Sequence, residues 1–133
     1  MSTTSSSTSG KTPITALVAV VDDDPRIRRL LEEELIDEGF EAQCYSDGFA
    51  LLDQLATAPP DLVLLDLMMP QLDGIECLRR LRQAGFEGPV LIFTALSDND
   101  KRRQADEEGA SEYILKPDLF ENLRRVIERH LQG

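Results

Sequence analysis

The chain has 133 residues, 41% of them hydrophobic, which is enough for one domain with a core and too few for two well-packed domains. Acidic residues outnumber basic ones by 25 to 14, and the formal net charge of −11 opposes direct binding to nucleic acid or to an anionic membrane. No apolar segment approaches the ~20 residues that span a bilayer. The N-terminus also lacks the apolar stretch of a secretory signal, so we expect a cytoplasmic protein.

Residues 1–13 are rich in serine and threonine and have nothing to bury, so the sequence predicts a disordered tail there and one domain over residues 14–133. From residue 16 onward, apolar runs of strand length alternate with segments whose apolar residues recur at helical spacing. This alternation is typical of repeated strand–helix units and predicts an α/β fold with a parallel sheet. The expected strands cover residues 16–21, 40–45, 62–66, 89–94 and 112–115.

Helices are expected after each strand. Asp24 can cap the first helix, Pro25 suits its first turn and Gly39 ends it. The inward stripe of this helix is Ile27, Leu30, Leu31 and Leu35. The second helix follows Asp47, and the third covers about residues 74–84. The last helix carries a stripe made of Leu119, Leu123, Val126, Ile127 and Leu131.

The segment Asp98–Glu108 differs from the others, because Ala105 is its only apolar residue. A helix there would be weakly anchored to the rest of the domain. Two interpretations follow. The segment is either an ordinary solvated surface helix or one that is free to shift, as a switch requires.

Polar side chains stand where the expected strands end. They are Asp22 and Asp23 after the first strand, Asp66 at the end of the third, Thr94 at the end of the fourth and Lys116 after the fifth. In a doubly wound sheet, strand ends at a topological switch point meet in one crevice, so these residues could share one site. Three crowded carboxylates repel each other, and at least one pKa should rise unless a cation compensates.

The types of residue in this crevice point to phosphoryl chemistry. Oxygen ligands without nearby imidazole or thiolate favour Mg²⁺, or Mn²⁺, over softer metals. Cys44 and Cys77 lack the spacing of a zinc set, and we interpret both as buried, reduced core residues. Asp66 is the candidate nucleophile, because a carboxylate oxygen can accept a phosphoryl group as an acyl phosphate. Lys116 would supply positive charge, and the Thr94 hydroxyl could hydrogen-bond a phosphoryl oxygen.

Together these residues resemble the receiver domains of bacterial two-component response regulators, over about residues 14–132. The similar elements are the metal-binding acid pair at Asp22-Asp23, the phosphoacceptor strand end and loop at residues 66–74, the switch hydroxyl and its small neighbour at Thr94-Ala95, the switch aromatic at Tyr113 and the phosphate-contacting lysine at Lys116-Pro117. The resemblance implies a flavodoxin-like, doubly wound (βα)5 three-layer sandwich with parallel strand order 2-1-3-4-5.

The resemblance also implies a set of roles. Magnesium would be bound by Asp23, Asp66 and the carbonyl of Met68, with Asp22 acting through water. The Lys116–Pro117 bond would be cis, a rare state. The phosphoryl group would come from a phosphohistidine on a sensor histidine kinase or histidine phosphotransfer protein, or from a small acyl phosphate.

By the same resemblance the chain is a phosphoacceptor switch rather than an enzyme. After phosphorylation of Asp66, Thr94 would move toward the phosphoryl group and Tyr113 would turn inward. The face formed by the fourth helix, the fifth strand and the final helix would change and so control the binding of a downstream protein partner. The basic residues of the fourth helix are either a solvated patch or part of that docking surface, and they are Lys101, Arg102 and Arg103.

The sequence departs from the family pattern at two places. Asp118 stands where the family commonly has an aromatic residue, and we interpret it as a cap of the last helix. Met68 and Leu96, two positions beyond Asp66 and Thr94, are both apolar. Our hypothesis is that these two side chains hinder the attacking water and lengthen the phosphorylated lifetime.

Other functions are less compatible with the sequence. A phosphatase of the aspartyl-phosphate type would want a second acid two residues after its nucleophile, where Met68 stands. Bound flavin phosphate would be repelled by three acids, and no phosphate-binding loop follows the first strand. A scaffold that keeps the fold and acts without phosphorylation stays open as the alternative, although intact Asp66, Thr94 and Lys116 argue against it.

Overall fold

The computed structural model describes residues 15–131, so the tail predicted over residues 1–13 lies outside the described residues. Within this range, one parallel sheet contains β2 (Leu17–Val21), β3 (Glu41–Tyr45), β4 (Leu62–Asp66), β5 (Val90–Thr94) and β6 (Glu112–Leu115). Their spatial order is β3-β2-β4-β5-β6, which is 2-1-3-4-5 when the strands are counted along the chain. The predicted fold class and strand order are confirmed.

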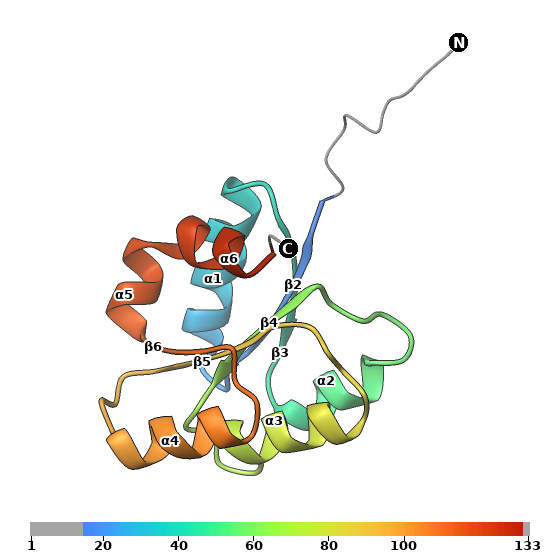
Figure 1. Cartoon of the computed structure of the whole chain (residues 1–133). Coiled ribbons are helices and arrows are strands. Elements are labelled where there is room, and N and C mark those ends of the chain that lie inside the picture. The colour runs from blue at the N-terminus through green and yellow to red at the C-terminus, as the bar shows by residue number, and fades with distance from the viewer. Residues whose placement is uncertain (1–14, 132–133) are drawn as a thin grey trace.

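Helices cover both faces of the sheet and complete a three-layer sandwich (Figure 1). One face carries α1 (Pro25–Asp37), α5 (Lys116–Glu121) and α6 (Leu123–Leu131). The other carries α2 (Gly48–Gln54), α3 (Gly74–Gln83) and α4 (Asn99–Glu107). Across residues 15–131, none of the helices has the length and apolar character that a bilayer crossing demands.

The two strands β4 and β5 are buried along their whole length, which explains their continuous apolar runs in the sequence. Successive side chains of a strand point to opposite faces, so Val63 packs with residues of α2, α3 and α4, whereas Leu64 packs with those of α1, α5 and α6. The same strands bury Asp66 and Thr94 at their carboxyl ends. Two hydrophobic clusters, one on each face of the sheet, therefore support the polar strand ends.

Aspartate side chains cap the helices that start near these strand ends. A side-chain oxygen of Asp24, Asp47, Asp73 and Asp98 accepts a backbone N–H at the start of α1, α2, α3 and α4, respectively. The predicted capping role of Asp24 is confirmed. Gly39 follows α1 with a φ of 94°, a conformation that glycine adopts readily, as expected of the residue that ends this helix.

The inward stripe of α1 is narrower than predicted. Leu31 and Leu35 are fully buried and Ile27 is partly buried, but Leu30 is 43% exposed. The prediction for Leu30 was wrong because neighbouring helical residues differ in direction by roughly 100°. Leu31 already occupies the direction that faces the sheet.

The predicted last helix is two helices, because Asn122 interrupts it with a φ of −130° and a ψ of 28°. The apolar spacing continues across this break, so the sequence pattern does not reveal it. Asp118 lies inside the first turn of α5, which already begins at Lys116, and its predicted capping role is therefore wrong.

The Lys116–Pro117 bond is trans, as are the other peptide bonds that the structure describes, so the cis bond implied by the family resemblance is not found. The trans isomer is the intrinsically favoured one, by about 0.5–1 kcal/mol. Pro117 also stands in the first turn of α5, where a missing backbone N–H removes no intrahelical hydrogen bond.

Helix α4 buries one side chain, that of Ala105, as the sequence predicts. Its C-terminal end is tied to α3, where Arg82 Nη2 donates to the Gly109 carbonyl oxygen at 2.7 Å. Toward the other end, Arg102 Nη1 donates to the Tyr113 carbonyl oxygen at 3.3 Å. A few polar contacts and a single small apolar side chain thus hold this helix.

Candidate functional site

Three carboxylates meet at the carboxyl edge of the sheet. Asp22 directly follows β2, Asp66 ends β4, and these two strands are paired with Val21 beside Leu65. Asp22, Asp23 and Asp66 each offer an oxygen, and these oxygens lie within 4.8 Å of one another. Asp22 and Asp66 are buried, whereas Asp23 is exposed. The predicted convergence of the acids is confirmed.

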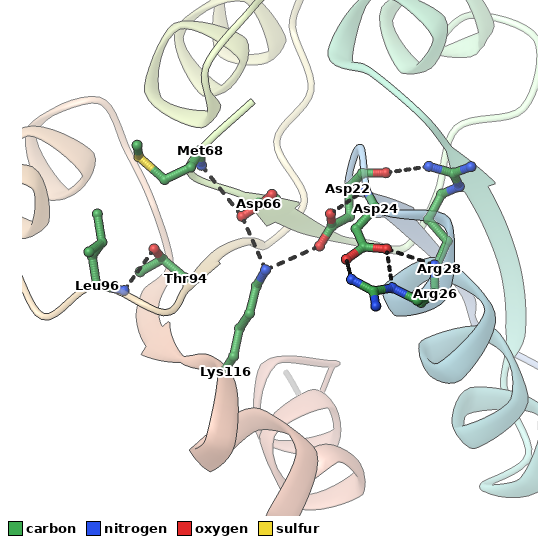
Figure 2. Close-up of polar contacts among 9 residues, drawn as sticks. All are labelled: Asp22, Asp24, Arg26, Arg28, Asp66, Met68, Thr94, Leu96 and Lys116. Atoms are coloured by element: carbon green, nitrogen blue, oxygen red, sulfur yellow. Dashed lines mark hydrogen bonds and ion pairs between the residues drawn. The ribbon is translucent and has the colours of Figure 1, made fainter. Parts of the chain in front are cut away.

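Asp22 is held by contacts from three directions. Its N–H donates to the Tyr45 carbonyl oxygen at 3.2 Å, and its Oδ1 accepts from the Asp24 N–H at 2.9 Å. Its own carbonyl oxygen accepts from Arg28 Nη1 at 2.7 Å (Figure 2). The remaining oxygen, Oδ2, is buried and has no hydrogen-bond partner among the described residues. The nearest positively charged group to this buried oxygen is the Lys116 ammonium, at an ion-pair distance of 3.5 Å.

Lys116 supplies the positive charge nearest to these acids. Its Nζ lies 3.5 Å from Asp22 Oδ2 and 3.7 Å from Asp66 Oδ1, between the two carboxylates (Figure 2). Both separations are ion-pair distances, longer than the roughly 2.7–2.9 Å of a charged hydrogen bond. The ammonium also lies 5.4 Å from the centroid of the Phe93 ring. One lysine thus faces two buried acids without bonding closely to either.

The pKa values of Asp22 and Asp66 are shifted by their surroundings. Burial raises the pKa of Asp66 to about 7, the charge of Asp22 adds to the shift, and Lys116 and the Met68 N–H oppose it. Burial also raises the pKa of Asp22, against the opposing effects of the Asp24 N–H and Lys116. The two carboxyls interact and so titrate as a pair. Additional positive charge at this edge would favour their ionised forms.

The residues present fit a hard divalent cation. All three side chains offer carboxylate oxygens, the ligands that hard divalent cations prefer. Within residues 15–131, this is the only cluster of three or more acidic, histidine or cysteine side chains close enough to share a metal ion.

Neither cysteine belongs to this acid cluster. Cys77 is buried as predicted, but Cys44 is only half-buried, which corrects its prediction as a buried residue, because β3 is an edge strand.

The loop after Asp66 passes close to the strand end. The Met68 N–H points to Asp66 Oδ1 at a long 3.4 Å, and the Met68 side chain is 56% exposed. A Cβ on Gly74 would lie 2.5 Å from the Asp66 carbonyl oxygen, so a side chain there would push the loop away. Sequence reasoning missed this constraint. A glycine at the first position of a helix, where it weakens the helix, was the available signal.

Thr94 and Tyr113 are connected through the backbone of a single residue, Leu96. Thr94 Oγ1 accepts from the Leu96 N–H at 3.1 Å, and the Tyr113 hydroxyl donates to the Leu96 carbonyl oxygen at 3.0 Å. Tyr113 is only 7% exposed, and the Arg102 guanidinium lies 4.7 Å from the centroid of its ring. Tyr113 is therefore directed inward in this structure, whereas its movement after phosphorylation stays a prediction. The hydrogen bond to Leu96 explains why the ring is retained there.

The structure thus places four predicted site residues together, and they are Asp22, Asp23, Asp66 and Lys116. Thr94 lies at the end of β5, the strand paired with β4, with its hydroxyl bonded to the next loop. Arg28 contacts this site and was missed, because a side-chain bond to a backbone carbonyl leaves no pattern in the sequence. The arrangement can place a nucleophilic carboxylate, a lysine and bound metal charge around one incoming group.

Comparison with known proteins gives an independent result. The family model described as response regulator receiver domain matches residues 18–128. The regulatory protein AtoC of Escherichia coli (strain K12) is 34% identical over 115 residues, which are 86% of this chain and 25% of AtoC. The response regulator MprA of Mycobacterium sp. (strain KMS) is 40% identical over 106 residues, 80% of this chain and 46% of MprA. This chain spans less than half the length of either relative.

Solved structures agree with this match. The chemotaxis protein CheY4 of Vibrio cholerae superposes with a TM-score of 0.84 at 28% identity, covering 89% of this chain and all of that one. The BeF3-activated N-terminal receiver domain of Klebsiella pneumoniae RstA gives a TM-score of 0.82 at 32% identity, with 88% and 99% coverage. This chain therefore belongs to the receiver domains of two-component response regulators, a family of phosphoacceptor signalling domains.

Proposed function

We propose that Asp66 is the phosphoacceptor of this receiver domain and that its phosphorylation requires Mg²⁺ or Mn²⁺. The observation that carries the proposal is the environment of Asp66. It ends a fully buried strand, lies 3.7 Å from Lys116 Nζ and shares an acid cluster with Asp22 and Asp23. A carboxylate in this position is held by the end of the sheet beside a lysine and the other acids.

The reaction transfers a phosphoryl group to a carboxylate oxygen of Asp66. That oxygen forms a bond to phosphorus while the bond from phosphorus to the donor breaks, and the donor keeps the electron pair. Lys116 is placed to meet a phosphoryl oxygen as negative charge builds up beside it. The donor is a phosphohistidine of a sensor histidine kinase or histidine phosphotransfer protein, or a small acyl phosphate.

The proposed ligands of the metal are side-chain oxygens of Asp23 and Asp66 and the backbone carbonyl of Met68, with Asp22 acting through water. When bound, the cation neutralises the acid cluster and the phosphoryl oxygens. Asp22 Oδ2 is buried and makes no hydrogen bond, and its ion pair with Lys116 is long at 3.5 Å, so a water molecule that donates to this oxygen would complete its bonding.

The hydrogen bonds around Leu96 support the proposed switch. Thr94 Oγ1 uses one acceptor site for the Leu96 N–H, so its own O–H is available to a phosphoryl oxygen while it stays bonded to the loop. Movement of this loop would reach Tyr113 through the Leu96 carbonyl and then α4, which buries only Ala105. The proposed output is a change of the face formed by α4, β6 and α6. A groove of about 670 Å³ lies between α4 and β6 and includes Arg102 among its lining residues.

The proposal is tested by incubating the protein with acetyl phosphate and Mg²⁺ and measuring its intact mass. We expect one phosphoryl addition that chelation prevents and that Asp66→Asn abolishes. Asp37→Asn, which changes an exposed carboxylate of α1, is the matched control and should be phosphorylated normally. Absence of phosphorylation with both acetyl phosphate and a phosphohistidine donor would favour a scaffold that acts without phosphorylation.

A second prediction concerns how long the phosphoryl group stays. Met68 and Leu96 are 56% and 45% exposed, next to Asp66 and Thr94 respectively. If their apolar side chains hinder water, the double variant Met68→Asn with Leu96→Glu should lose its phosphoryl group several-fold faster than wild type. The rate is measured by following the phosphorylated mass over time.

The control for this measurement is Ile36→Gln, because Ile36 is an exposed apolar residue near the far end of α1. Its dephosphorylation rate should equal that of wild type. A double variant that keeps its phosphoryl group as long as wild type, or longer, would show that the two apolar side chains do not protect it.

A further inference from the structure

Arg28 of α1 contacts the acid turn directly, although it carries none of the chemistry described above. Its Nη1 donates to the Asp22 carbonyl oxygen at 2.7 Å (Figure 2). We propose that Arg28 is a positioning residue for the metal site, which clamps the peptide between Asp22 and Asp23 and so sets the place of the Asp23 carboxylate. The inference rests on the proposed function, because it concerns the same site.

The clamp acts through the planarity of the peptide group. Fixing the direction of the Asp22 carbonyl fixes the plane from which the Asp23 Cα departs. Asp23 is exposed, so packing does not place its side chain, and the backbone has to do so. The N–H of Asp22 is already fixed by the Tyr45 carbonyl oxygen. The hydrogen bond from Arg28 also fixes the Asp22 carbonyl, which belongs to the peptide group that leads into Asp23.

The base of the clamp is itself anchored. The Arg28 N–H donates to the Asp24 carbonyl oxygen at 3.1 Å in the first turn of α1, and Cys44 Sγ of β3 contacts the Arg28 carbonyl oxygen at 3.8 Å. The Arg28 side chain, which is partly buried, then folds back toward the start of the helix. It therefore links α1, the acid turn and the sheet edge.

Electrostatics alone would not put an arginine there. The N-terminal end of a helix carries partial positive charge, which disfavours a cation beside it. A nearby guanidinium also repels a divalent cation. If Arg28 acted only through its charge, its removal would strengthen Mg²⁺ binding, whereas a clamp predicts that removal weakens it. The direction of the effect separates the two roles.

The test compares Arg28→Met with Arg29→Met by measuring Mg²⁺ dissociation constants on the unphosphorylated protein with calorimetry. Arg29 is exposed on the same helix, so both variants remove one charge from α1. We expect Arg28→Met to bind Mg²⁺ about 10-fold more weakly than Arg29→Met, in the range found for partners that orient metal ligands. Arg28→Lys, which keeps the charge and a donor of similar reach, should recover most of the affinity.

Thermal unfolding without Mg²⁺ identifies a merely structural role, which would lower Tm and leave the dissociation constant unchanged. If Arg28→Met does not fold, Arg28→Gln carries the same expectation, because its shorter side chain cannot reach the Asp22 carbonyl. A folded variant with unchanged or tighter Mg²⁺ binding overturns the clamp and leaves the proposed function standing. A wild-type protein that binds no Mg²⁺ and accepts no phosphoryl group overturns both.

Discussion

Replacing Lys116 with methionine should lower the unfolding free energy of the metal-free protein by about 3 kcal/mol at pH 8, the size expected when a buried charge loses its partner. Lys116 Nζ is 3.5 Å from Asp22 Oδ2 and 3.7 Å from Asp66 Oδ1, and both carboxylates are buried. Methionine keeps an apolar stem without the charge, so the carboxylates would face each other uncompensated. Urea unfolding in the presence of a chelator measures the loss.

The loss of unfolding free energy caused by Lys116→Met should be smaller at pH 5 than at pH 8. Lys116 lowers the pKa of both Asp22 and Asp66, so its effect on stability is largest where these carboxyls are ionised. Lys101→Met, in the polar helix α4, is the matched control and should change stability little at either pH. An equal loss at both pH values would mean that Lys116 stabilises the fold by packing rather than by charge.

The sequence was most informative where one local rule decided the structure. The strands β4 and β5 are buried throughout, so their uninterrupted apolar runs identified them and the acid and hydroxyl at their ends. The parallel arrangement then brought Asp22 and Asp66 together, as strand ends in such a sheet must meet. Ala105, the only apolar residue of its segment, likewise predicted that α4 would bury little of its surface.

The sequence was less informative where two rules competed or where a backbone atom was the partner. The apolar spacing around Asn122 fits one helix as well as two, so the break was missed. Leu30 has the same chemistry as its buried neighbour Leu31, and only the direction of its side chain differs. The Arg28 contact and the Tyr113 bond to Leu96 both use carbonyl oxygens, which every residue has.

Asp66→Asn should make the metal-free protein more stable at pH 8, by about 4 kcal/mol at ~1.4 kcal/mol per unit of pKa difference. Burial raises the pKa of Asp66 to about 7, with the charge of Asp22 adding to it, whereas an unfolded aspartate titrates near ~3.9. The stabilising effect of a protonated Asp66 is fully present below the unfolded pKa and is lost as pH rises through the folded pKa. Asparagine does not ionise, so the variant avoids this loss.

The difference in unfolding free energy between Asp66→Asn and wild type should therefore be small near pH 4 and reach its full size above pH 7, as measured by urea unfolding with a chelator. Asp37→Asn, at an exposed carboxylate, should show no such rise. A difference in unfolding free energy that does not change with pH would contradict the raised pKa of Asp66. Added Mg²⁺ should stabilise wild type and have little effect on Asp66→Asn, because only the charged cluster attracts the cation. The buried acids that weaken the empty domain would then be the same groups that make metal and phosphoryl binding favourable.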